Sequence, residues 1–292
     1  MPMLVLQAII DGILVGGFYA LMAGGLTLVF GVMDIVNFAQ GILVVLGAYL
    51  SYALYSHLHI DPFLGLLITI PVMFGVGITV YWTMIKPIKR ERVIMSLLTM
   101  FAVGTAVEGI LDYIFTSNLV AIHTSYVNAS VRLGSLVFPS IYLYAFVMSV
   151  LILGGVYYLL YRTRFGRSLR ASMQNPTAAR LVGINTDWVS AFTLGIGVGL
   201  AAAGGMVFGL TNSFDAASSY DLISRLLAIV ILGGFGSLSG ALVASILMLV
   251  IQDVVAVVWS PTWGQTTFYI VLVLVLLIRP QGLLGRKAVR AQ

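Results

Sequence analysis

Long apolar runs, separated by short polar stretches, fill most of this 292-residue chain. A helix that crosses the hydrocarbon core of a membrane needs about 20 residues, most of them apolar. The pattern therefore predicts an all-α, polytopic transmembrane helix bundle of about nine spans, formed by residues 1–292 as a single domain. An eight-span version, in which one N-terminal piece is re-entrant, stays open. The predicted spans are residues 4–30, 41–57, 63–85, 93–116, 140–161, 188–213, 222–238, 241–259 and 265–279.

The composition agrees with lipid as the main solvent of the chain. Hydrophobic residues make up 60% of the sequence and charged residues only 9%, whereas a soluble domain has about 25% charged residues. The net charge of +5 could attract nucleic acid, but its confinement to short loops favours a role in membrane orientation. We therefore expect no nucleic-acid partner. The chain has no cysteine, which excludes disulfides and thiolate metal sites.

Positive charge is concentrated in three short clusters that hold 13 of the 15 Lys and Arg residues. Basic loops are retained on the cytoplasmic side of a membrane, so the clusters predict the inner face. Two loops on the same side of a membrane are joined by an even number of spans. Two predicted spans separate the first cluster from the second, and four separate the second from the third, so both numbers agree with this requirement. The count places the N-terminus outside and the C-terminus in the cytoplasm. The clusters are Lys86, Lys89, Arg90, Arg92; Arg162, Arg164, Arg167, Arg170, Arg180; and Arg279, Arg286, Lys287, Arg290.

Glycines recur four residues apart within several predicted spans. Such spacing lets helix backbones approach closely in lipid, where van der Waals packing takes the place of the hydrophobic effect in holding helices together. It predicts a tightly packed bundle, while a role as hinges for conformational change is compatible. The pairs are Gly12 and Gly16, Gly195 and Gly199, Gly205 and Gly209, and Gly236 and Gly240.

The longest predicted cytoplasmic segment, residues 162–187, contains the signals of a complete short helix. Asn175 is a favoured N-cap, Pro176 suits the first helical position, and Gly183 supplies a left-handed C-terminal residue. The segment is either an orientation loop or a helix for a partner, and the pattern alone leaves both open. One face of the helix would be apolar, with Ala178, Leu181 and Val182 at i, i+3 and i+4 spacing.

Motifs that would indicate an enzyme are missing from the sequence. No Lys follows a Gly, so the phosphate-binding loop of many ATPases is absent. The run 236–240 has Leu238 where a nucleophile elbow needs its serine. The histidines fall in predicted outer loops without a third metal ligand. We expect no catalytic residue, no cofactor and no metal site.

Five motifs lie in order along the chain, at residues 37–41, 164–171, 183–187, 233–237 and 279–286. Together they resemble the LivH-type permease subunit of bacterial branched-chain amino-acid ABC importers. The resemblance implies a membrane subunit of the bacterial cytoplasmic (inner) membrane that pairs with a second, LivM-type permease. It also implies two cytoplasmic ATP-binding subunits and a periplasmic or extracellular substrate-binding protein. ATP hydrolysis would then belong to partner chains.

In importers of this type, a cytoplasmic helix between two spans docks on the ATP-binding subunit. The resemblance therefore implies this role for the helix from Asn175 to Val182. Arg167, Arg170 and Arg180 are expected as flanking contacts.

Polar residues inside apolar stretches suggest where a substrate passes. Asn37 and Gln40 interrupt a long apolar stretch, and they either line a pathway or form a plain turn. Glu108 and Asp112 lie four residues apart on one helix face, where ionisable groups usually face a bundle interior. A path for a zwitterion and a structural ion pair, with Arg225 as one partner, both explain them.

Three other functions stay open at this stage. The same importer class could carry another cargo, such as urea, short amides, other amino acids or a sugar. An ion-coupled secondary transporter could use Glu108 or Asp112 as a proton site. An intramembrane enzyme, with Ser237 or Ser239 as nucleophile, has the least support.

Overall fold

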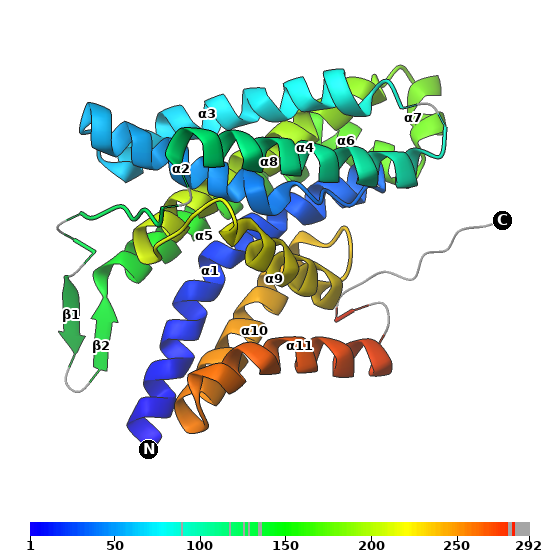
Figure 1. The fold of residues 1–292 in the computed structure, drawn as a ribbon. Helices are drawn as coiled ribbons and strands as arrows, with labels where there is room; N and C mark the ends of the chain where they lie inside the picture. The colour runs from blue at the N-terminus through cyan, green and yellow to red at the C-terminus, as the bar shows by residue number, and fades with distance from the viewer. Residues whose placement is uncertain are drawn as a thin grey trace.

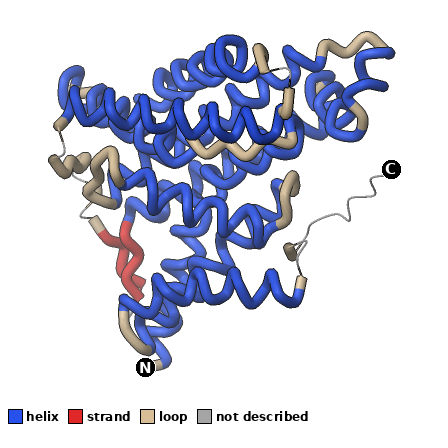
Figure 2. The backbone as a smooth tube through the Cα atoms, turned by 45° about the vertical axis from the view of Figure 1, so that its right-hand side comes forward, coloured by secondary structure: helices blue, strands red, loops and turns tan. Residues whose placement is uncertain are grey.

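The computed structural model describes the whole chain except residues 89, 117, 125, 128, 134–135, 280–281 and 284–292. Helices form almost all of it, with one two-stranded hairpin (Figures 1 and 2). The all-α bundle expected from the sequence is confirmed. In chain order the elements are α1 (Pro2–Met33), α2 (Gln40–Leu58), α3 (Pro62–Val80), η1 (Tyr81–Ile85), α4 (Arg92–Phe115), β1 (Ser130–Leu133), β2 (Leu136–Pro139), α5 (Ser140–Arg162), α6 (Arg164–Gln174), α7 (Pro176–Leu181), α8 (Thr186–Thr211), α9 (Ser218–Gly233), α10 (Leu238–Val258) and α11 (Pro261–Ile278).

Eight helical segments in the described part of the chain are long and apolar enough to cross a membrane. The ninth predicted span, residues 222–238, is α9, which has 16 residues and is therefore about 24 Å long. That length is below the roughly 30 Å of a hydrocarbon core. The short element is thus α9, and not an N-terminal piece, because α1 is one continuous helix of 32 residues.

The bundle has two ends, which we call the hairpin end, where β1 and β2 lie, and the basic end, where α6 and α7 lie (Figure 1). Lys86 of the first basic cluster lies over the Trp82 ring at the basic end, and the ring centroids of Trp82 and of Trp188 in α8 are 5.3 Å apart. The chain after α11 returns to α9, with the Leu283 amide donating to the Leu232 carbonyl over 2.6 Å. Lys89, Arg286, Lys287 and Arg290 lie outside the described residues.

Despite its length, α9 runs between these two ends. At its start, the Tyr220 hydroxyl donates to Glu108 in the half of α4 nearer the hairpin end. Beyond its last residue, Gly236 packs against Gly31, which also lies beside Met173 of α6. We therefore count α9 as a short crossing element in addition to the eight long spans.

Helices α1 and α8 form the centre of the bundle, and in each of them 83% of the most apolar window is buried within the chain. They cross where Gly25 meets Gly197, too closely for a Cβ on either residue. A Cβ on Gly205 of α8 would overlap the carbonyl oxygen of Val44 in α2. The contact of Gly205 is the tight helix packing that the glycine spacing predicted, whereas Gly25 and Gly197 were not among the predicted pairs.

The predicted pair Gly236 and Gly240 is an exception. Gly236 lies in the turn between α9 and α10 with φ +77, in the left-handed region that favours glycine. Gly236 therefore allows the chain to turn between the two helices, and it does not pack inside a span. Gly240, in the first turn of α10, packs against Gly233 of α9.

The hairpin end is covered by segments that the apolar pattern did not predict. β1 and β2 pair in antiparallel register, with Val131 opposite Phe138. The side chain of Gln7 in α1 accepts from the Val137 amide over 3.1 Å. The Tyr126 hydroxyl donates to Asp61 over 3.0 Å. Burial raises the pKa of Tyr126, and the hydrogen bond to Asp61 acts in the same direction, so this hydroxyl keeps its proton and remains a donor.

Candidate functional site

The segment between α5 and α8 folds as two helices, of which the sequence predicted one. The additional helix, α6, begins after Thr163, whose hydroxyl accepts from the Gly166 amide over 3.1 Å. Its buried residues, Gly166, Leu169 and Ser172, face the bundle, and its arginines give it a strongly amphipathic pattern. The i, i+4 spacing of Phe165 and Leu169 was the signal for this helix in the sequence.

The short helix α7 has the caps that the sequence predicted. The Asn175 side chain accepts from the Ala178 amide over 3.0 Å, and Gly183 has the left-handed φ of +84. Ala179 is buried, at 3% exposed, while Leu181 and Val182 are 84% and 76% exposed. Ala178 is also exposed, so the predicted apolar face of α7 points away from the rest of the chain.

The three arginines expected beside this face are not equivalent. The Arg170 guanidinium donates to the Leu160 carbonyl and lies over the Tyr161 ring. The Arg180 Nε donates to the Thr186 hydroxyl over 2.6 Å, and its guanidinium lies 3.7 Å from the Asp187 carboxylate. Arg170 and Arg180 thus have partners within the chain, although the Arg180 side chain is 60% exposed, and Arg167 is exposed as well.

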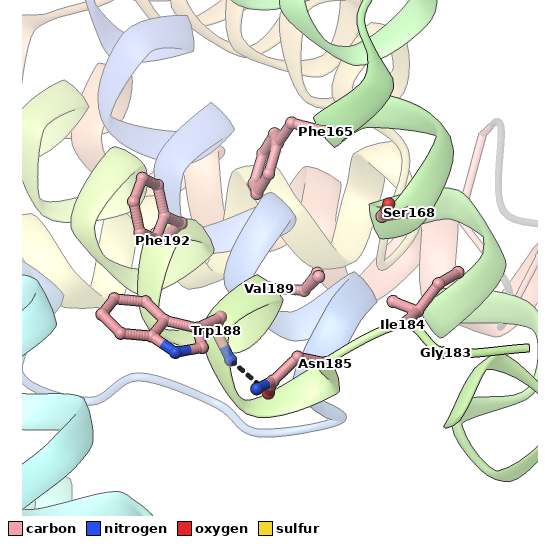
Figure 3. A pocket seen from close by; sticks show the side chains of 8 residues that line it. All are labelled: Phe165, Ser168, Gly183, Ile184, Asn185, Trp188, Val189 and Phe192. Carbon is pink, nitrogen blue, oxygen red and sulfur yellow. Dashed lines mark hydrogen bonds between the residues drawn. The ribbon is translucent and has the colours of Figure 1, made fainter. Parts of the chain in front are cut away.

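A mostly apolar groove of about 490 Å³ lies between α6 and the first turns of α8 (Figure 3). Asn185 forms its floor near α8 and accepts from the Asp187 and Trp188 amides, at 3.2 Å each. Phe165, Trp188 and Phe192 present their rings to the groove (Figure 3). The sequence did not predict this groove, because its walls come from α6, from α8 and from the linker between α7 and α8. The lining residues are Phe165, Ser168, Gly183, Ile184, Asn185, Trp188, Val189 and Phe192.

Asn37 and Gln40, which were candidates for the transport path, lie at the junction of α1, α2 and α8. Both are fully buried, at 0% exposed. The Asn37 amide donates to the Gln40 side-chain oxygen over 3.0 Å, and the Gln40 amide donates to the carbonyls of Met22 and Gly197 over 3.2 and 3.3 Å. These side chains fill a helix junction in this structure and do not line an open path.

Glu108 and Asp112 share one face of α4, as their spacing predicted, but this face is not in the interior of the bundle, and Glu108 is only half-buried. Glu108 accepts from the Tyr220 hydroxyl of α9 over 2.7 Å, and Asp112 is exposed. Arg225 does not pair with either of them. Its Nε donates to Asp221 over 2.8 Å and its Nη1 to Gln252 over 2.9 Å, so its ion pair is local to α9.

The comparisons with known proteins cover nearly the whole chain. A permease of a high-affinity branched-chain amino acid transport system, BraD of Pseudomonas aeruginosa, is 27% identical over 97% of this chain and 97% of its own length. The LivH permease of Escherichia coli K12 is 26% identical over 97% and 96%. A probable LivH of Methanocaldococcus jannaschii is 27% identical over 96% and 92%.

A shorter similarity, 31% identity over 36% of this chain, connects it with LsrC, an autoinducer 2 import system permease of Yersinia enterocolitica. No solved structure matches the chain. A sequence model described as "Branched-chain amino acid transport system / permease component" matches residues 8–278. The chain therefore belongs to the family of permease components of branched-chain amino acid transport systems.

Proposed function

We propose that this protein is the membrane-spanning permease subunit of an ATP-driven importer that moves branched-chain amino acids across the cytoplasmic membrane of a bacterium. Family membership and the names of the full-length relatives support this function. The single structural observation that carries it is the exposed apolar face of α7. A six-residue helix is too short to be stable alone, yet this one is capped and displays Leu181 and Val182 outward.

The basic end faces the cytoplasm in this proposal, and the C-terminus lies on the same side. The positive-inside rule supports that orientation, because Lys86, the α6 arginines and Arg279 lie at one end of the bundle. Two ATP-binding subunits would bind there and supply the energy. A second, LivM-type permease would complete the transport path, and a substrate-binding protein would dock at the hairpin end.

The side chains of the segment 162–187 have two different roles in this proposal. Ala178, Leu181 and Val182 enter a cleft on the ATP-binding subunit, and Arg167 contacts its rim. Asn175, Arg170 and Arg180 hold the segment in shape, because their polar atoms already have partners within the chain. The groove beside Trp188 adjoins α7 through Gly183 and Ile184 and extends the same apolar surface.

Cross-linking from α7 tests the proposal directly, and the absence of cysteine from the chain makes the wild type a clean background. Ala178→Cys, treated with a short bifunctional thiol reagent in membranes that contain the whole transporter, should join the chain to an ATP-hydrolysing subunit. Leu119→Cys, at a position that is also exposed but near the hairpin end, is the matched control and should not. Capture of that subunit only from Leu119→Cys would contradict the assigned orientation.

Uptake into vesicles that contain the assembled transporter tests the mechanism and the cargo. Accumulation of leucine, isoleucine or valine should require ATP and the binding protein. Uptake that persists without ATP and collapses with the proton gradient would replace the proposal with ion-coupled transport. Uptake of another compound that leucine does not inhibit would keep the importer class and change the cargo.

A further inference from the structure

A polar strip runs along one uncovered side of the bundle and is not explained by helix packing. Tyr220, Asp221 and Ser224 project from the same face of α9 and are exposed. Glu108 and Asp112 of α4 lie beside them, and the hydrogen bond from Tyr220 to Glu108 joins the two helices. Both helices lie on the near side of the bundle in Figure 1.

The strip lies at membrane depth. Glu108 is seven residues before the end of α4, which corresponds to about 10 Å along the helix axis. The whole of α4 is 24 residues, about 36 Å, so only a few ångströms of it extend beyond the hydrocarbon core at each end. Glu108 and its partner Tyr220 therefore lie below the membrane surface.

Contact with lipid is energetically unfavourable for the polar side chains of this strip. Ionised and hydrogen-bonding side chains at this depth normally face a protein interior or a water-filled cavity. This chain leaves Asp112, Tyr220, Asp221 and Ser224 exposed and covers Glu108 only in part. Ser224 lies one turn deeper than Tyr220, so the polar surface continues inward along α9.

We propose that Tyr220, Asp221 and Ser224 of α9, together with Glu108 and Asp112 of α4, line the hairpin-end half of the water-filled transport path and contact the amino acid in transit. The inference rests on the proposed function and adds the α9 residues to it. Hydroxyl groups suit the ammonium and carboxylate of a zwitterion, since a hydroxyl both donates and accepts. Three carboxylates against one guanidinium, that of Arg225, give the strip a net negative charge.

Labelling of single cysteines in the assembled, ATP-driven transporter tests this assignment. Ser224→Cys and, as a second position on the same face, Ala217→Cys should react with charged, membrane-impermeant thiosulfonate reagents. A cationic reagent should react at least threefold faster than an anionic one because the strip is negative. An excess of the transported amino acid during ATP turnover should slow labelling of Ser224→Cys at least twofold, and labelling of Ala217→Cys should abolish the uptake that this second variant shows beforehand.

Leu151→Cys is the matched control, because Leu151 lies in the middle of α5 and is 70% exposed. It faces lipid in the proposal and should not react with either reagent. If Ser224→Cys and Ala217→Cys stay unreactive in a transporter that imports amino acids with ATP, the second permease or lipid covers the strip and the inference is wrong. If the assembly shows no ATP-driven import at all, the proposed function fails, and the assignment of the path fails with it.

Discussion

The buried hydrogen bonds of Gln40 allow a quantitative test of what holds the centre of the bundle together. Gln40→Leu keeps a side chain of similar size but removes three hydrogen bonds, one from Asn37 and two to backbone carbonyls. At about 0.6 kcal/mol for each such bond in a membrane protein, the loss is about 2 kcal/mol. The Asn37 amide would also lose its acceptor in a fully buried site, which costs about 1 kcal/mol or more.

We therefore expect Gln40→Leu to lower the free energy of unfolding by about 3 kcal/mol, and the melting temperature by roughly 6–12 °C at the scaling measured for domains of about 150–250 residues. Melting of the detergent-purified chain, followed by the amount that stays monodisperse after heating, measures this directly. Gln265→Leu is the control, because Gln265 is an exposed glutamine on α11 and its replacement should shift the melting point by less than 1 °C.

The opposite pattern would refute the reasoning. If Gln40→Leu melts like the wild type while uptake by the assembled transporter is lost, Gln40 contacts the substrate in a state that this structure does not represent. Its role at the helix junction would then be secondary.

Three further predictions concern α7 and the helix crossings. Asn175→Ala removes the cap of α7, worth about 1 kcal/mol, and should reduce the amount of substrate moved per ATP hydrolysed, whereas Asn175→Asp should not. Leu181→Asp should change the melting point little, since the side chain is exposed, but should weaken co-purification of the ATP-binding subunit about tenfold or more. Gly205→Val should lower the melting point strongly, by at least the 1–3 kcal/mol typical of overpacking, because its side chain would overlap the Val44 carbonyl; Gly154→Val, where no atom lies within 4 Å, should be tolerated.

The spans were predictable because lipid sets the length of an apolar run whatever the tertiary structure. The predicted span 140–161 corresponds to Ser140–Arg162, and 63–85 to Pro62–Ile85. The prediction was shifted at α9, since 222–238 begins after the first residue of Ser218–Gly233 and ends beyond its last, because the apolar run continues past the end of this helix. Gly234 and Gly236 both adopt positive φ there, and composition does not distinguish a glycine that ends a helix from one that packs inside it.

The candidate site was only partly predictable, because some of the contacts that form it join residues far apart in the sequence. The caps of α7 are local in sequence, so the pattern identified them. The role of Gln40 depends on the carbonyl of Gly197, 157 residues away, and a polar residue at a helix break looks the same whether it faces water or another helix. Arg167 and Arg170 are likewise indistinguishable in sequence, but the fold of α6 exposes one and turns the other to Leu160.

The attachment of α7 to α8 has a consequence for how a movement at the basic end spreads through the bundle. Arg180 joins α7 to the first turn of α8, and α8 touches α1, α2 and α3 through glycines that leave no side chain between the backbones. A displacement of α7 would thus be transmitted to α8 and on to α1, α2 and α3, because no flexible side chains separate the backbones at these contacts. The centre of the bundle and the short helix would have to shift in step, as one part.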